Sequence, residues 1–280
     1  MENEIKARGI IKRRHPRSRK GENGRLVVIG GSTRYYGAPA LVSLAAMRVG
    51  ADLVYTLVPE RIAPTVASYS PDLIVWGYSG DSLNPSIYPF VKELSLKADS
   101  LVIGNGLTRE HDVKKTAQRV VNSWEKPIVL DADAIGALET PEGRTVYTPH
   151  DNEFLRLTGK CPPDSIIERT SIVKHEARKI GATILLKGAI DVISDGERTH
   201  TNRTGNAAMT CGGTGDVLAG IVGAFLSQGY SPFDAARIGA YVNGLAGDIA
   251  YDRFGYSMRA TDVLDTMPSA IQRIHGRSQK

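Results

Sequence analysis

Short and continuously apolar runs recur along the first half of the chain, and helical patterns lie between them. The runs cover residues 25–31, 52–59, 71–77, 100–106 and 127–133. Each run is too short for an independent helix and ends in Gly, Pro or Asp, which predicts a buried strand. Helices are expected over residues 39–50, 86–97 and 109–123. Buried strands that alternate with helices are typical of a parallel sheet covered on both faces.

The second half extends this pattern and adds a hairpin. Strands are expected at residues 145–150 and 183–188, and a hairpin that turns at Asp195-Gly196 follows them. The expected helices cover residues 164–180, 214–227, 232–251 and 260–274, and a further one starts at Asp151. We find no internal repeat and no linker, so residues 21–280 are expected to form a single domain behind a basic leader of residues 1–20.

Composition narrows the classes of partner. Residues 6–21 carry eight Lys or Arg of a chain whose net charge is +5. They form either a nucleic-acid tail, a solvated leader or a weak attractor of anionic, phosphorylated molecules. No aromatic residue interleaves with these charges and no nucleic-acid motif follows, so we expect no nucleic-acid partner. With no apolar run of about 20 residues and no signal-peptide core, we expect a cytoplasmic protein without a membrane partner.

The segment NAAMTCGGTGDVLAG, residues 206–220, holds the strongest candidate chemistry. Its glycines precede an apolar helix, whose first N–H groups carry partial positive charge and can bind a phosphate. Asp216 follows directly, and a carboxylate there would repel a phosphate but can deprotonate an attacking hydroxyl. The alternative is an ordinary helix start with a favourable acidic residue. The segment is not a Walker loop, and residues 30–37 are not a dinucleotide fingerprint.

Other polar residues follow strands, where parallel sheets bind ligands. Gly106 ends a Gly-x-Gly turn, and Lys187 leaves an apolar strand as a phosphate candidate or a solvated end. Asp131 and Asp133 are expected on one side of their strand, as helix caps or as contacts of magnesium or phosphate.

The segment TPHDNEFLRL, residues 148–157, has two readings. His150 is placed for a substrate amide or phosphate, whereas Glu153 and Arg156 suit an ordinary i,i+3 pair on a surface helix. Ala38, within YYGAPAL, either lets a ligand approach or starts a helix. The two cysteines, Cys161 and Cys211, match no metal spacing, and a reducing compartment is the simple expectation.

The order of these motifs carries a resemblance. VIGGS, YYGAPAL, GNGL, VLDADA, TPHDNEFLRL, LLKGAID and NAAMTCGGTGDVLAG follow one another between residues 21 and 262. This order resembles the NAD(P)H-hydrate dehydratase family, a branch of the ribokinase-like fold. The chain departs from the family where Asn105 and Thr108 stand in place of Pro and Gly, and where Ala207 stands in place of Pro. The chain looks like a stand-alone dehydratase without the epimerase domain of some relatives.

The resemblance implies an α/β protein: a ribokinase-like three-layer α/β/α sandwich with a central, mostly parallel sheet. It implies dehydration of (6S)-NADHX or NADPHX to NADH or NADPH, driven by ADP or ATP. The substrate hydroxyl is phosphorylated and phosphate is then eliminated. Asp216 would be the general base. Mg²⁺ would bridge the donor phosphates, with its protein ligands left open. A homo-oligomer, with a tetramer among the options, and functional pairing with an NAD(P)HX epimerase are also implied.

The resemblance assigns further residues by position. NAD(P)HX would contact Ala38, Gly106, His150, Asn152, Glu153, Arg156 and Asp216. The nucleotide donor would contact Lys187, Gly188, Ala189, Ile190, Asp191, Asn206, Gly212, Gly213, Thr214 and Gly215. The choice of donor and the preference between NADHX and NADPHX stay open.

Two other functions also fit the glycine-rich segment. One is a ribokinase-like kinase acting on a vitamin precursor or a sugar alcohol, which needs the same GxGD chemistry. The other is a non-catalytic nucleotide-binding protein, which would not need Asp216. TPHDNEFLRL favours the dehydratase over the kinase, and an Asp216→Asn variant separates either enzyme from the binder.

Overall fold

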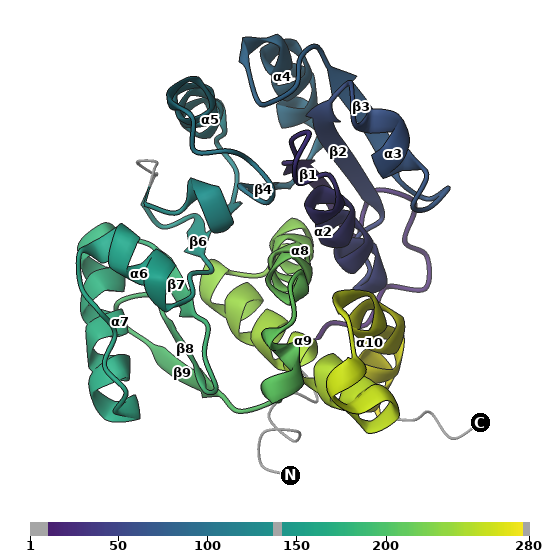
Figure 1. Cartoon of the computed structure of the whole chain (residues 1–280). Coiled ribbons are helices and arrows are strands. Elements are labelled where there is room, and N and C mark those ends of the chain that lie inside the picture. The colour runs from purple at the N-terminus through teal and green to yellow at the C-terminus, as the bar shows by residue number, and fades with distance from the viewer. Residues whose placement is uncertain (1–10, 137–141, 277–280) are drawn as a thin grey trace.

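A computed structural model describes residues 11–136 and 142–276 (Figure 1). Its strands form a nine-stranded sheet in the order β3-β2-β1-β4-β5-β6-β7-β8-β9. The strands from β3 to β7 in this order pair in parallel, and β8 and β9 add an antiparallel hairpin. The expected mostly parallel sheet is therefore confirmed. The strands are β1 (Arg25–Ile29), β2 (Leu53–Pro59), β3 (Ile74–Tyr78), β4 (Ser100–Ile103), β5 (Ile128–Leu130), β6 (Thr145–Tyr147), β7 (Thr183–Leu186), β8 (Asp191–Ser194) and β9 (Thr199–Asn202).

Helices cover both faces of this sheet. The α-helices are α2 (Gly37–Arg48), α3 (Ala63–Ala67), α4 (Tyr88–Lys97), α5 (His111–Ser123), α6 (Asp151–Thr158), α7 (Ile166–Ile180), α8 (Thr214–Ser227), α9 (Pro232–Phe254) and α10 (Ala260–His275). Short 3₁₀ turns are η1 (Pro85–Ile87), η2 (Ala132–Ala134), η3 (Ala207–Thr210) and η4 (Gly255–Ser257). The sequence did not predict α3. None of the helices in the described ranges is long and apolar enough to cross a membrane.

Alternation along the strands separates two cores. Leu26 and Val28 of β1 pack into the cluster built with α2, α8, α9 and α10. Val27 and Ile29 point to the opposite face and pack with α4, α5 and α7. Because successive side chains of a strand point to opposite faces, a continuously apolar strand serves both cores. Each core lies between the sheet and the helices on that face, and these helices form the outer layers of the three-layer α/β/α sandwich.

The helix α8 lies close to the centre of the sheet because it contains glycines where its neighbours approach. A Cβ on Gly220 would lie 2.1 Å from the Val42 carbonyl oxygen, and one on Gly223 would lie 2.3 Å from Val102 Cγ2. Both distances are far below van der Waals contact, so close packing explains these glycines. The first turn of α8 is thereby held beside the carboxyl ends of β4 and β5.

The described part of the basic leader lies at the amino ends of the strands, opposite the first turn of α8. The Lys12 backbone N–H donates to the Tyr230 hydroxyl at 2.6 Å. Arg14 Nη1 forms an ion pair with Asp52 Oδ1 at 3.1 Å, directly before β2 begins. Lys12 and Arg14 therefore attach this mostly exposed segment near the amino ends of the strands. The rest of the expected leader, residues 1–10, lies outside the described residues.

Candidate active site

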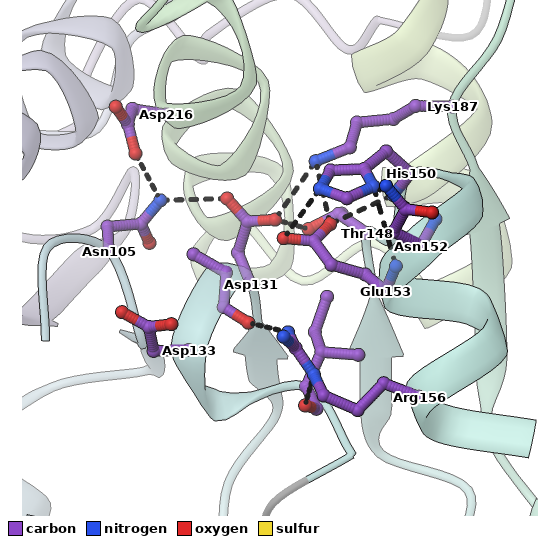
Figure 2. Close-up of polar contacts among 12 residues, drawn as sticks. Asn105, Asp131, Asp133, Thr148, His150, Asn152, Glu153, Arg156, Lys187 and Asp216 are labelled. Atoms are coloured by element: carbon purple, nitrogen blue, oxygen red, sulfur yellow. Dashed lines mark hydrogen bonds and ion pairs between the residues drawn. The ribbon is translucent and has the colours of Figure 1, made fainter. Parts of the chain in front are cut away.

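Side chains that follow four neighbouring strands meet the first turn of α8 (Figure 2). Asn105 follows β4, Asp131 follows β5, Thr148 follows β6 and Lys187 follows β7. Asp216 lies in the first turn of α8. Parallel strands end at the same edge of a sheet, which is why residues so distant in sequence converge here. The sequence placed the ligand crevice at this edge.

Asp216 lies in a largely buried position beside Asn105. Asn105 Nδ2 donates to Asp216 Oδ1 at 2.7 Å. Burial raises the pKa of Asp216 to about 6, and the charges of Asp131 and Glu153 add to the rise, while Asn105 and Lys187 oppose it. A carboxylate with a pKa near 6 is ionised at neutral pH and holds a proton better than an ordinary aspartate does. These are the properties of a general base.

Lys187 is the cation of the cluster. Its Nζ lies 3.2 Å from Asp131 Oδ1 and 3.6 Å from Glu153 Oε2. Burial lowers the pKa of Lys187, but the two carboxylates outweigh burial and leave the pKa raised. A Cβ placed on Gly215 would lie 3.4 Å from the same Nζ. The ammonium group therefore faces the start of α8, where it can stabilise an anion together with the helix N-terminus.

The glycine-rich segment leaves the start of α8 open. Gly213 has φ +97, and a Cβ there would lie 2.7 Å from Leu41 Cδ1, so this position requires glycine. A Cβ on Gly212 would meet no atom of the described residues within 4 Å. The N-cap residue of α8 is Gly213, which has no side chain that could cap the helix. The first N–H groups of α8 are thus available to a phosphate.

His150 and Glu153 form a reciprocal cap at the start of α6. His150 Nδ1 accepts from the N–H groups of Asn152 and Glu153, at 3.2 and 3.4 Å. Glu153 Oε2 accepts from the His150 N–H at 2.9 Å. An accepting Nδ1 carries no proton, so Nε2 bears the imidazole hydrogen. About half of the His150 side chain is exposed, and it remains accessible to a substrate.

The loop after β4 lies against the loop before α2. Gly106 has φ +74, and a Cβ there would lie 2.6 Å from the Tyr35 carbonyl oxygen and 3.2 Å from Ala38 Cβ. Tyr35 and Tyr36 are exposed beside this contact. The two small residues expected at the substrate, Ala38 and Gly106, are therefore neighbours. Their contact with a substrate stays a prediction.

The side chain of Asp133 points away from Asp131. Asp133 pairs with Arg109 at 2.6 Å, and the expectation that it shares a side with Asp131 is wrong. The strand ends at Leu130 and Ala132 takes φ +51, so strand alternation does not extend to Asp133. Figure 2 shows the two carboxylates directed apart.

Arg156 also has protein partners of its own. Its guanidinium donates to the carbonyls of Ile135 and Ala132, at 2.8 and 2.7 Å, rather than to Glu153. The i,i+3 pair that the sequence allowed is therefore not what holds this side chain.

Several side chains expected at the nucleotide bind the protein itself. Asp191 accepts from the Gly188 N–H and from Asn202 Nδ2, both at 3.0 Å, and burial raises its pKa. Asn206 caps η3 and donates to Asp248 at 3.0 Å. Thr214 Oγ1 donates to the Met209 carbonyl at 2.7 Å. These bonds fix the loops 188–191 and 206–214, whose backbone groups are the more direct candidates for donor contacts.

Sequence reasoning missed the side chains of Asn105 and Thr148. Thr148 Oγ1 donates to Asp131 Oδ1 at 2.8 Å, and Asn105 Nδ2 donates to Asp131 Oδ2 at 2.8 Å. Thr148 directly follows β6, and Asn105 comes two residues after the end of β4. A position at a strand end is a signal that was applied to Lys187 but not to these two residues. Together with Lys187, these two residues hold the Asp131 carboxylate from three sides.

Comparison with known proteins decides the family. A family model described as NAD(P)H-hydrate dehydratase matches residues 26–269. The chain belongs to the NAD(P)H-hydrate dehydratase family. The ADP-dependent (S)-NAD(P)H-hydrate dehydratase of Cenarchaeum symbiosum is 41% identical over 97% of this chain and 96% of its own length. The bifunctional NAD(P)H-hydrate repair enzyme of Pyrobaculum aerophilum is 42% identical over 91% of this chain. The chain spans about half of that relative's length, 52%.

Solved structures of this family share the fold. The ADP/ATP-dependent NAD(P)H-hydrate dehydratase of Bacillus subtilis, co-crystallised with ATP/Mg²⁺, has a TM-score of 0.84 to this chain. The two chains are 26% identical, and the alignment covers 97% of each. The expected ribokinase-like fold is confirmed by this likeness.

Proposed function

We propose that this dehydratase-family chain converts (6S)-NADHX or NADPHX to NADH or NADPH, with ADP or ATP as the phosphoryl donor. The carrying observation is the pair formed by Asp216 and the uncapped, glycine-rich start of α8. The start of α8 suits a migrating phosphoryl group, and Asp216 suits the hydroxyl that receives it. The names of relatives that cover most of this chain support the same substrate class.

The residues suit a phosphorylation followed by an elimination. Hydroxide on the reduced ring is a poor leaving group. Asp216 takes the hydroxyl proton while that oxygen bonds to the donor's terminal phosphorus and the bond to the donor's bridging oxygen breaks. The ring nitrogen then supplies the electron pair that expels phosphate from carbon, and loss of a proton from the adjacent ring carbon restores the double bond. The N–H groups of Gly213, Thr214 and Gly215 with Lys187 would stabilise charge on the phosphoryl group.

We assign the two ligands to the two sides of Asp216. The hydrated nicotinamide nucleotide would lie toward Ala38, Gly106 and the start of α6, where the half-exposed His150 side chain is accessible. The donor would lie toward Lys187 and the loops 188–191 and 206–215. Arg156 and Asn206 would act on their ligands in part through the loops that they hold, because each side chain already donates to groups of the protein.

The site also suits Mg²⁺ carried on the donor phosphates. Mg²⁺ takes one or two carboxylates together with phosphate oxygens and water. Asp131 and Glu153 are the carboxylates beside Lys187. Within residues 11–136 and 142–276 no group of three His, Cys, Asp or Glu side chains forms a complete metal site. When bound, Mg²⁺ supplies charge neutralisation to the phosphates.

Further features of the proposal concern the cellular setting. We expect a cytoplasmic homo-oligomer that acts on the product of an epimerase for NAD(P)HX. A relative twice as long as the matched region and named a bifunctional repair enzyme supports the pairing with a second repair activity.

A direct assay tests the proposal. The purified chain is mixed with hydrated NADH, Mg²⁺ and either ADP or ATP, and absorbance of the reduced nicotinamide is followed while free phosphate is measured. We expect NADH and phosphate to form in equal amounts, only when a donor is present. Absence of NADH with both donors, from a folded protein that binds nucleotide, would overturn the proposal. Transfer of phosphate to a stable alcohol product would then identify a kinase.

A further inference from the structure

The carboxamide of Asn105 lies between two carboxylates of the site. Its Nδ2 donates to Asp216 Oδ1 at 2.7 Å and to Asp131 Oδ2 at 2.8 Å. A carboxamide nitrogen has two hydrogens, so both are used. The Asn105 side chain is fully buried. Figure 2 shows the amide nitrogen aimed between the two acids.

The backbone around Asn105 is fixed on both sides. Gly104 and Gly106 take φ +131 and +74, which favour glycine. The Gly31 N–H donates to the backbone carbonyl of Asn105 at 2.9 Å, and a Cβ on Gly30 would lie 2.3 Å from that backbone oxygen. The carboxamide therefore projects from a rigid loop, which is how a group that must be placed accurately is supported.

The orientation of the carboxamide is also unique. Its Oδ1 is buried and has no hydrogen-bond partner among the described residues. A 180° rotation would place this oxygen against two carboxylates, which offer no hydrogen. A buried carbonyl without a partner reduces stability, so fold stability alone does not explain an asparagine at this position. Holding the two acids does explain it.

Asp216 depends on this one donor. Among residues of the described ranges, Asn105 is the side chain that donates a hydrogen bond to Asp216. The other charged groups that face Asp216 come from three elements: Asp131 after β5, Glu153 in α6 and Lys187 after β7. The first two disfavour the ionised form of Asp216, and Lys187 favours it.

We propose that Asn105 is a positioning residue, whose carboxamide holds the Asp216 carboxylate in place and ties it to Asp131 and Lys187. The inference rests on the proposed function of Asp216 as the general base. Removing the hydrogen bond releases the carboxylate and removes one of the two influences that lower the pKa of Asp216. The rate then falls, and the acid limb of its pH profile moves to higher pH.

Two variants test this role by kinetics. Asn105→Leu is close in volume and makes no hydrogen bond, whereas Asn105→Ser keeps one O–H donor. We expect Asn105→Leu to lower kcat about 10²-fold and to move the acid limb upward by about one pH unit. KM for the donor should change little. Asn105→Ser should fall between the wild type and Asn105→Leu in both readouts.

Asn84→Ala is the matched control. The Asn84 carboxamide also holds a turn, donating to the carbonyls of Ser79 and Ser82 at 2.6 and 2.9 Å, but it lies before η1 and outside the site. We expect its acid limb and kcat to equal those of the wild type. If Asn105 were merely structural, Asn105→Leu would lower the melting temperature and would lower the rate equally at every pH, without moving the acid limb.

A direct titration separates this inference from the proposed function. The chain is labelled with ¹³C at aspartate carboxyls, and the Asp216 signal is assigned by its loss in Asp216→Asn. We expect the titration midpoint of Asp216 to rise in Asn105→Leu and, by less, in Asn105→Ser. An unchanged midpoint in both folded variants would overturn the role of Asn105. A raised midpoint in a protein without dehydratase activity would uphold that role and refute the proposed function.

Discussion

Two aspartates, one at the amino ends and one at the carboxyl ends of the strands, show how the same type of side chain can be an anchor or a base. Asp52 precedes β2 at the amino edge, and its Oδ2 accepts from the N–H groups of Gly21 and Asn23 and from Asn23 Nδ2, at 2.9, 3.1 and 2.9 Å. Asp216 opens α8 at the carboxyl edge and accepts from Asn105 alone among the described side chains. The pKa of Asp52 is lowered, whereas that of Asp216 is raised to about 6.

The two groups differ both in the effect of burial, which is the largest cause of the raised pKa of Asp216, and in the number of hydrogen-bond donors that oppose it. Burial raises the pKa of both groups, and at Asp52 the hydrogen bonds of Asn23 and Gly21 and the charge of Arg14 outweigh it. At Asp216 one hydrogen bond and Lys187 do not outweigh burial and two neighbouring acids. A carboxylate with many donors is a structural anchor, and one with few donors retains basicity for proton transfer.

The largest effect should come from Asp216→Asn. The amide cannot take the hydroxyl proton, so we expect kcat to fall about 10²–10⁴-fold. The free energy of unfolding should not fall, because a buried charge is replaced by a neutral group of the same shape. NADH formation and urea unfolding measure the two quantities. Full activity in this variant would show that Asp216 is not the base and would leave the contrast with Asp52 without a chemical meaning.

The pH dependence of stability should be opposite for the two aspartates. The folded pKa of Asp216, about 6, lies above its usual 3.8, so the folded state binds the extra proton between these values. Stability contributed by this group is present below about pH 4 and is lost as pH rises through about 6, by up to about 3 kcal/mol. Asp216→Asn should therefore gain stability relative to the wild type over this window. Urea unfolding of both proteins at several pH values checks the trend, and parallel curves would contradict it.

Much of the site's location follows from the sequence because strand ends can be recognised there. Lys187, Asp131 and His150 each follow an apolar run, and parallel strands bring such residues to one edge. The glycines before Asp216 likewise predict an open helix start, and in the structure the N-cap residue is Gly213, which has no capping side chain. Fold class and the gathering of these residues were therefore accessible from local patterns together with the family resemblance.

What the sequence could not show depends on contacts distant along the chain or on single backbone angles. The bond from Asn105 to Asp216 joins residues 111 positions apart, and no local pattern announces it. Asp133 was misplaced because Ala132 adopts φ +51 and ends the strand alternation. The partners of Arg156 are backbone carbonyls, which carry no sequence signal.

The smallest effect should come from Asp52→Asn, which tests the anchor. The amide loses its charge toward Arg14 and turns part of an acceptor group into a donor, opposite the N–H groups of Gly21 and Asn23. We expect the free energy of unfolding to fall by about 1–3 kcal/mol, with NADH formation per folded molecule unchanged. Because its pKa is lowered, Asp52 stabilises above about pH 4 and loses this contribution as pH falls further, so the difference from wild type should shrink in acid. Asp252→Asn, on an exposed part of α9, is the control with no expected change. A loss of activity in Asp52→Asn without a loss of stability would mean that the two edges of the sheet are not functionally separate.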